Sequence, residues 1–165
     1  MTTELEALIN ALREELQQYG EMLALLDQQQ DLVVRRAPAE LLDSVARIQG
    51  QAQAIVEARQ QRQHRQGDLA RSLDLSFEAA FQDLFGLLPG EYRPLVQALV
   101  QENNQLLVRV HQRSRQNHLL LTRSVELMQR LINTLLPATD GSTYNQTGSV
   151  HCRPAPARSL YTAVG

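Results

Sequence analysis

From about Thr3 to Arg36, apolar side chains recur at alternating intervals of four and three residues. This spacing keeps one face of an α-helix turned toward a partner helix and does not fit the two-residue period of a strand. At 1.5 Å per residue, such a helix is roughly 50 Å long. Its predicted seam consists of Leu5, Ile9, Leu12, Leu16, Tyr19, Leu23, Leu26 and Val33, with Gln30 as the polar position.

Ala37-Pro38 interrupts this pattern, and Pro38 suits the first turn of a second helix. Because the connection is so short, the two helices are expected to fold back as an antiparallel hairpin. The apolar seam of this second helix is Leu41, Val45, Ile48, Ala52 and Ile55, and its next positions are the polar residues Arg59, Arg62 and Gln66. We expect this polar stretch to be a solvated helix end that loosens near Gly67.

A shorter third helix is predicted where the three phenylalanines, Phe77, Phe81 and Phe85, recur every four residues. Ser76 is its expected N-cap, and Gly86 marks its expected end or a kink. The simplest interpretation of the rings is that they plug one end of a helical bundle.

The fourth segment, from about Glu91 to Leu136, predicts a helix roughly 70 Å long. Three of its seam positions are polar, namely Asn103, Arg113 and Asn117, and a buried Asn at such a place usually fixes helix register. Its carboxyl end stays apolar and needs a cover. The apolar seam is Val96, Leu99, Leu106, Val110, Leu120, Leu127 and Leu131, followed by Ile132, Leu135 and Leu136.

These segments predict an all-α fold, an elongated antiparallel helical bundle or coiled coil with three long helices and one shorter helix. The bundle domain would cover residues 1–136, and residues 137–165, which have no helical or strand period, would form a disordered tail. Composition agrees, because 43% of residues are apolar and only 4% aromatic, which suits an aliphatic helical core. With 16 basic and 18 acidic residues, no general nucleic-acid binding is expected.

The start, MTTELEALIN, is no secretory signal, and no apolar stretch approaches the roughly 20 residues that cross a bilayer. We therefore expect a cytoplasmic protein without membrane insertion. The lone Cys152 excludes an internal disulfide and a cysteine zinc site. No phosphate-binding loop, nucleophile elbow or zinc-protease motif occurs, so neither an enzyme nor a cofactor is expected.

Two further clusters leave alternatives open. His64, His111 and His118 would hold a metal only if their helices pack suitably, and no carboxylates sit at ligand spacing around them, so no metal site is expected. Arginines gather in two stretches, which are either solvated faces or, if the second and fourth helices align, a positive girdle for an acidic partner. The stretches are Arg59, Arg62 and Arg65, and Arg109, Arg113, Arg115 and Arg123.

The last predicted helix, RQNHLLLTRSVELMQRLINTLLP, is followed closely by STYNQTGSVHCR. Together with LLDQQQDLVVRRAPAELL near the first hairpin, these segments resemble the FlgN-type flagellar export chaperones. The resemblance spans most of the chain. The positions that match the family pattern in the last helix and tail are Asn117, Leu120, Leu121, Leu135, Pro137, Tyr144 and Gly148.

The resemblance implies a chaperone that binds hook-filament junction proteins, prevents their early assembly and delivers them to the flagellar type III export apparatus. It places the cargo site on the last helix and implies that Tyr144 docks on the export gate. The alternative is a structural coiled-coil protein whose heptads drive self-association, and a homodimer is compatible with either hypothesis. The implied cargo-binding residues are Asn117, Leu120, Leu121, Val125, Met128, Leu131, Ile132 and Leu135.

Overall fold

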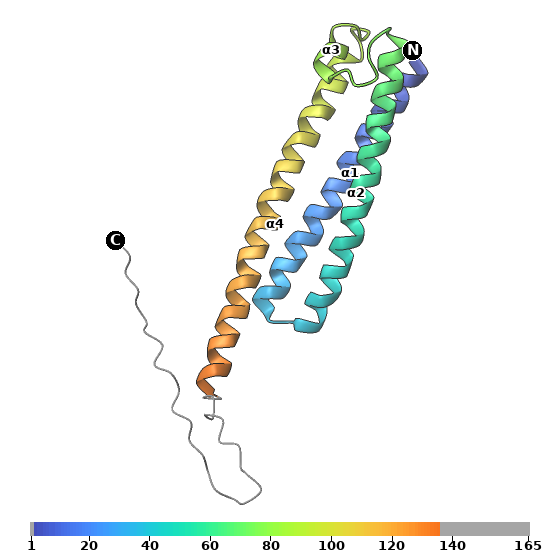
Figure 1. Cartoon of the computed structure of the whole chain (residues 1–165). Coiled ribbons are helices and arrows are strands. Elements are labelled where there is room, and N and C mark those ends of the chain that lie inside the picture. Colours follow the sequence, from blue (N-terminus) through green and yellow to red (C-terminus); the bar gives the residue numbers. More distant parts are fainter. Residues whose placement is uncertain (1, 136–165) are drawn as a thin grey trace, which may run out of the picture. The chain divides into compact units, whose positions relative to one another are not determined.

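The computed structural model describes residues 2–135, and these residues form helices joined by short loops, with no strand among them (Figure 1). The predicted all-α class is confirmed, whereas the predicted tail lies outside the described residues. No helix within residues 2–135 is both long and apolar enough to span a membrane. The chain divides into two compact units, Met1–Leu121 and Thr122–Gly165. The helices are α1 (Thr2–Arg35), α2 (Pro38–Ser72), α3 (Phe81–Phe85) and α4 (Arg93–Leu135).

The predicted hairpin between α1 and α2 is present, and its turn has a simple backbone explanation. Arg36 has a left-handed φ of 56°, and the N–H groups of Arg36 and Ala37 donate to Val33 O and Leu32 O, each at 3.2 Å. This pairing satisfies the last carbonyls of α1 and reverses the chain. Pro38 then opens α2, where its missing N–H costs nothing.

Five of the eight apolar residues in the predicted α1 seam are buried. The line through Leu5, Leu12 and Leu26 is buried, but Leu16 is only half-buried, as is Leu23. A second buried line consists of Leu8, Glu15, Met22 and Gln29, each of which lies one residue before a predicted seam position. The cause is that α1 has two partners, since it packs against α2 and also receives side chains from α4, which widens its buried face. The buried residues are Leu5, Leu8, Ile9, Leu12, Glu15, Tyr19, Met22, Leu26, Gln29 and Leu32.

The second helix differs from the prediction at both ends. Near its start, Val45 and Ala52 are exposed rather than part of the seam. Near its end, the helix does not loosen at Gly67 but continues to Ser72, and Gly67 itself is buried. A side chain added at Gly67 would collide with the Phe77 ring, so this glycine accommodates a tertiary contact rather than ending the helix.

The third helix is shorter than predicted and begins at Phe81, not after Ser76. Its start is fixed by Asp83, whose Oδ2 accepts a hydrogen bond from Ala80 N at 3.1 Å. Phe81 and Phe85 are half-buried and pack against the core cluster, at the end of the bundle where α1 begins. That cluster consists of Leu5, Leu8, Ile9, Leu12, Leu69, Leu88, Val96 and Leu99.

Candidate protein-interaction surface

The carboxyl end of α4 carries a row of large apolar side chains on successive turns, which we call the α4 stripe. These side chains are well exposed, from 47% for Ile132 to 70% for Leu135. Leu127, which was not among the candidate cargo residues, is also exposed, and its apolar side chain was the available signal. The stripe consists of Val125, Met128, Leu131, Ile132 and Leu135, all five of them candidate cargo residues.

The other three candidate cargo residues lie in the first unit and differ from the stripe in burial. Leu120 and Leu121 are half-buried. Asn117 is fully buried, and its Nδ2 donates to Leu26 O at 2.7 Å and to Gln29 Oε1 at 3.1 Å. The side chain of Asn117 is therefore occupied in packing α4 on α1 and is not displayed on the surface.

The two buried asparagines of α4 contact α1 in a regular way. Asn103 Nδ2 donates to Leu12 O at 3.0 Å, and Asn117 repeats the contact with Leu26 O. The two donors are 14 residues apart, and so are the two acceptors, which makes α1 and α4 parallel and keeps them in constant register. This agrees with the expected role of buried Asn, because an amide in the seam is satisfied only in one alignment.

An ion pair reinforces this alignment between the two asparagines. Arg113 Nε lies 2.6 Å from Asp27 Oδ1, and its Nη1 donates to Gln30 Oε1 at 2.7 Å. Arg113 is half-buried and therefore belongs to the contact between α1 and α4. It does not join a solvated positive girdle.

A buried polar layer crosses the upper part of the bundle. Glu15 accepts a hydrogen bond from Tyr19 Oη at 2.9 Å and forms an ion pair with Arg62 Nε at 2.9 Å. Arg62 also lies over the Phe81 ring, 5.7 Å from its centroid, and donates to Gln66 Oε1. The layer thus links α1, α2 and α3, and Glu15, only 4% exposed, was missed because a carboxylate is normally a surface residue.

Alkaline pH provides a test of this layer. Burial, together with the neighbouring Glu15 carboxylate, raises the pKa of Tyr19 to about 12. Because the folded pKa exceeds the ordinary value of 10.0, this contribution to stability is complete below pH 10 and is lost as the pH rises toward 12. We expect the free energy of unfolding, measured with urea, to fall less steeply between pH 10 and 12 in Tyr19→Phe than in the parent. Equal slopes in Tyr19→Phe and the parent would contradict the assignment.

The described residues contain no group of three or more metal-binding side chains. His64 Nε2 instead lies 3.5 Å from Asp68 Oδ2, one turn further along α2. Tyr144, the candidate for docking on the export gate, lies outside the described residues.

Comparison with known proteins identifies the family of this chain. Neither a curated protein nor a solved structure matches the chain significantly. The family model described as FlgN protein matches residues 1–151, which is most of the chain and includes every helix described above. The chain therefore belongs to the FlgN family of flagellar export chaperones.

Proposed function

We propose that this protein is a cytoplasmic type III export chaperone for hook-filament junction proteins. It binds them before export, prevents their early assembly and delivers them to the flagellar export apparatus. Family membership supports the general role, and the α4 stripe is the observation that supports binding of an apolar partner.

The α4 stripe suits a partner that presents an amphipathic helix. Five apolar side chains on successive turns offer the facing surface that helix-in-groove packing requires. Met128 adds a flexible and polarizable contact that adapts to different partners. Binding of this kind is reversible and needs no covalent chemistry, so we propose that the protein is not an enzyme and works without a cofactor or metal.

Replacing Leu131 with aspartate tests the cargo site. An ionised carboxylate in the centre of the α4 stripe would have to be desolvated on binding. We expect Leu131→Asp to weaken the affinity for a purified hook-filament junction protein about tenfold, which is roughly 1.4 kcal/mol, in isothermal titration calorimetry.

The matched control is Leu42→Asp, the same change at an α2 leucine that is 74% exposed. It should leave the affinity unchanged, and circular dichroism should show both variants as helical as the parent. Unchanged affinity in Leu131→Asp would rule out the α4 stripe as the cargo site.

Tyr144 is proposed to dock the chaperone on the export gate. Since this role is separate from cargo binding, Tyr144→Ala should retain folding and cargo affinity but reduce binding to the purified gate protein. Tyr161→Ala is the matched control in the same segment. Equal gate binding by Tyr144→Ala and the parent would remove this role.

A structural coiled-coil protein is the second candidate, because the same α4 stripe could bury against a second copy. Light scattering distinguishes the two hypotheses. A stable higher oligomer without affinity for junction proteins would favour the coiled-coil role, whereas a monomer or modest dimer that binds them supports the chaperone.

A further inference from the structure

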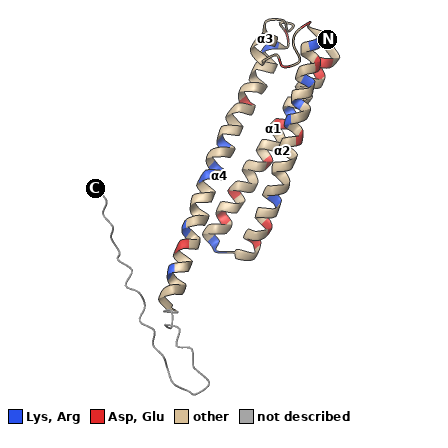
Figure 2. Ribbon diagram, in the orientation of Figure 1, with Lys and Arg blue, Asp and Glu red and all other residues tan. Residues whose placement is uncertain are grey.

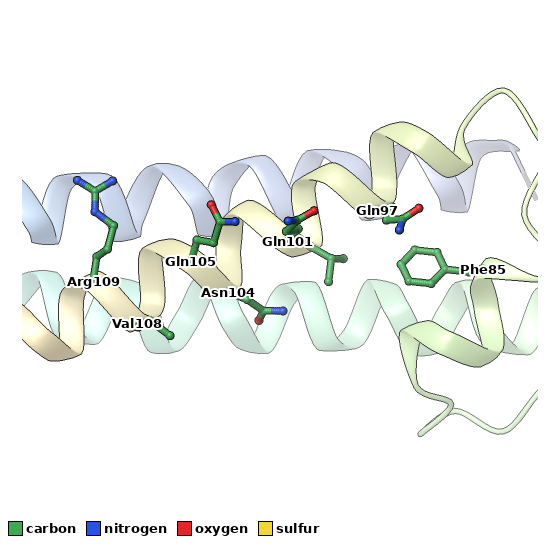
Figure 3. Close-up of a pocket in the computed structure, with 8 residues that line it drawn as sticks. Phe85, Gln97, Gln101, Asn104, Gln105, Val108 and Arg109 are labelled. Carbon is green, nitrogen blue, oxygen red and sulfur yellow. The ribbon is translucent and has the colours of Figure 1, made fainter.

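Two neighbouring hollows lie in the first unit, on either side of Val100 and Asn104 of α4, which line both of them. The inner cavity has a volume of about 180 Å³ and is bounded by residues of all four helices, Arg59 and Asn103 among them. The outer groove has a volume of about 630 Å³ and is open to solvent along α4, with the Phe85 ring beside Gln97 at one end (Figure 3). Neither hollow includes a residue of the α4 stripe.

The outer groove has the length and lining of a helix-binding surface. From Gln97 to Arg109 it follows 13 residues of α4, which corresponds to about 18 Å, or roughly three helical turns. Apolar contact area comes from Phe85, Val100 and Val108, and Val108 is exposed. An exposed apolar surface bordered by amide side chains is typical of protein-interaction sites.

Asn103, which lines the inner cavity, has a buried acceptor without a donor. Asn103 is 6% exposed, and its Nδ2 is used in two hydrogen bonds, but its Oδ1 is buried and has no partner within the described residues. An unpaired buried polar atom is costly, so the cavity favours an occupant that brings a donor group.

Two arginines beside the hollows differ from Arg62, which lines the inner cavity but is paired with Glu15. Arg59 of α2 lines the inner cavity and Arg109 of α4 lines the outer groove. Both arginines are exposed, and neither forms an ion pair with an acidic side chain of residues 2–135. The first-unit part of α4, residues 93–121, contains four arginines and one acidic residue, Glu102, and basic colour dominates this stretch in Figure 2. Of these arginines, Arg113 is paired with Asp27 of α1.

We propose that these two hollows form one docking site for an acidic amphipathic helix of a partner protein. Its apolar side chains cover Phe85, Val100 and Val108, and one side chain with a hydrogen-bond donor reaches Asn103 Oδ1. Carboxylates on its flanks pair with Arg59 and Arg109, which makes charge complementarity the basis of selection. The site is independent of the proposed cargo site and would stand if the α4 stripe had another role.

The probe is a synthetic, fluorescently labelled 16-residue helical peptide with leucines along one face, one central glutamine and glutamates on both flanks. Two companion peptides carry glutamine or lysine in place of the glutamates. Fluorescence anisotropy measures their affinity for the full chain, both the parent and Leu131→Asp, so that capture by the α4 stripe is recognised. We expect the glutamate peptide to bind both proteins equally and the other two peptides to bind more weakly.

Reversal of both arginines, Arg59→Glu with Arg109→Glu, should weaken binding of the glutamate peptide about tenfold and restore binding of the lysine peptide. The matched control, Arg13→Glu with Arg35→Glu, makes the same change in net charge on α1. It should leave the affinity for the glutamate peptide nearly unchanged at physiological salt. Val108→Asn, which changes no charge and leaves both arginines in place, should weaken binding of the glutamate and glutamine peptides alike.

Several outcomes would overturn the proposal. These are no binding of the glutamate peptide at about 1 mM, equal affinity for the glutamine peptide, or equal losses in the control pair. Dependence of binding on Leu131 would assign the peptide to the α4 stripe. Loss of self-association in the double arginine variant would make a second copy the occupant, and preferential, arginine-dependent binding of a 20-nucleotide single-stranded DNA would make it a nucleic acid.

Discussion

Arg62→Met is expected to lower the free energy of unfolding by about 3 kcal/mol, because it removes the only cationic partner that the structure gives to a buried carboxylate. Glu15 is 4% exposed, and its Oε2 lies 2.9 Å from Arg62 Nε. Tyr19 would remain as a hydrogen-bond donor to Oε1, but a neutral hydroxyl does not replace the guanidinium charge. Urea denaturation at pH 7 measures the change.

A double variant separates the lost charge pair from lost packing. Glu15→Leu together with Arg62→Met removes both charges, so it should recover much of the stability that Arg62→Met loses. The control is Arg65→Met, the same substitution one turn away on α2, where the arginine side chain is 54% exposed. The control should change the free energy of unfolding by less than about 0.5 kcal/mol. If Arg62→Met lost no more stability than Arg65→Met, the ion pair would not stabilise the fold.

The sequence predicts the helices and the hairpin well because their signals are local. A heptad pattern, Ala37-Pro38 and a long apolar repeat after Pro94 each act within a few residues of the element that they specify. Which face of a helix is buried depends on how many neighbours it has, and this information is not local. On α1, the second buried line contains Glu15 and Gln29, whose polarity predicts exposure until the partners Arg62 and Asn117 are known.

In the candidate cargo site, too, the sequence identifies the residues but not which of them the neighbouring helices bury. The family resemblance implies the residues of the α4 stripe, and the structure displays their apolar side chains on its surface. Asn117 has the same spacing but is buried, because α1 offers Leu26 O and Gln29 to its amide. Spacing identifies a helix face, but only the packing of the other helices decides where that face is covered.

Gly67 illustrates a signal that is read wrongly from sequence alone. Glycine lowers helix propensity, so a helix end is the natural prediction at this position. In the structure α2 continues, and the Phe77 ring packs directly on Gly67, with the Arg71 guanidinium 4.3 Å from the ring centroid and the His64 ring at 6.0 Å. The missing side chain provides the space that this ring occupies.

Two glycine-to-alanine substitutions on α2 are therefore expected to change stability in opposite directions. At Gly50 an added Cβ meets nothing within 4 Å, so Gly50→Ala should raise the free energy of unfolding by about 1 kcal/mol through helix propensity. At Gly67 the added Cβ would lie only 2.0 Å from Phe77 Cε2, so the ring must leave its site. Gly67→Ala should lower the free energy of unfolding by about 2 kcal/mol, despite the same gain in propensity.

Removal of the ring tests the cause of this difference. In a Phe77→Ala background the space beside Gly67 is open, so Gly67→Ala should become stabilising, as Gly50→Ala is in the parent. Urea denaturation of the four combinations of residues 67 and 77 gives the coupling between them. A coupling near zero, or stabilisation by Gly67→Ala in the parent, would show that Phe77 does not hold its place on Gly67, so that this ring would not anchor the loop between α2 and α3 on α2.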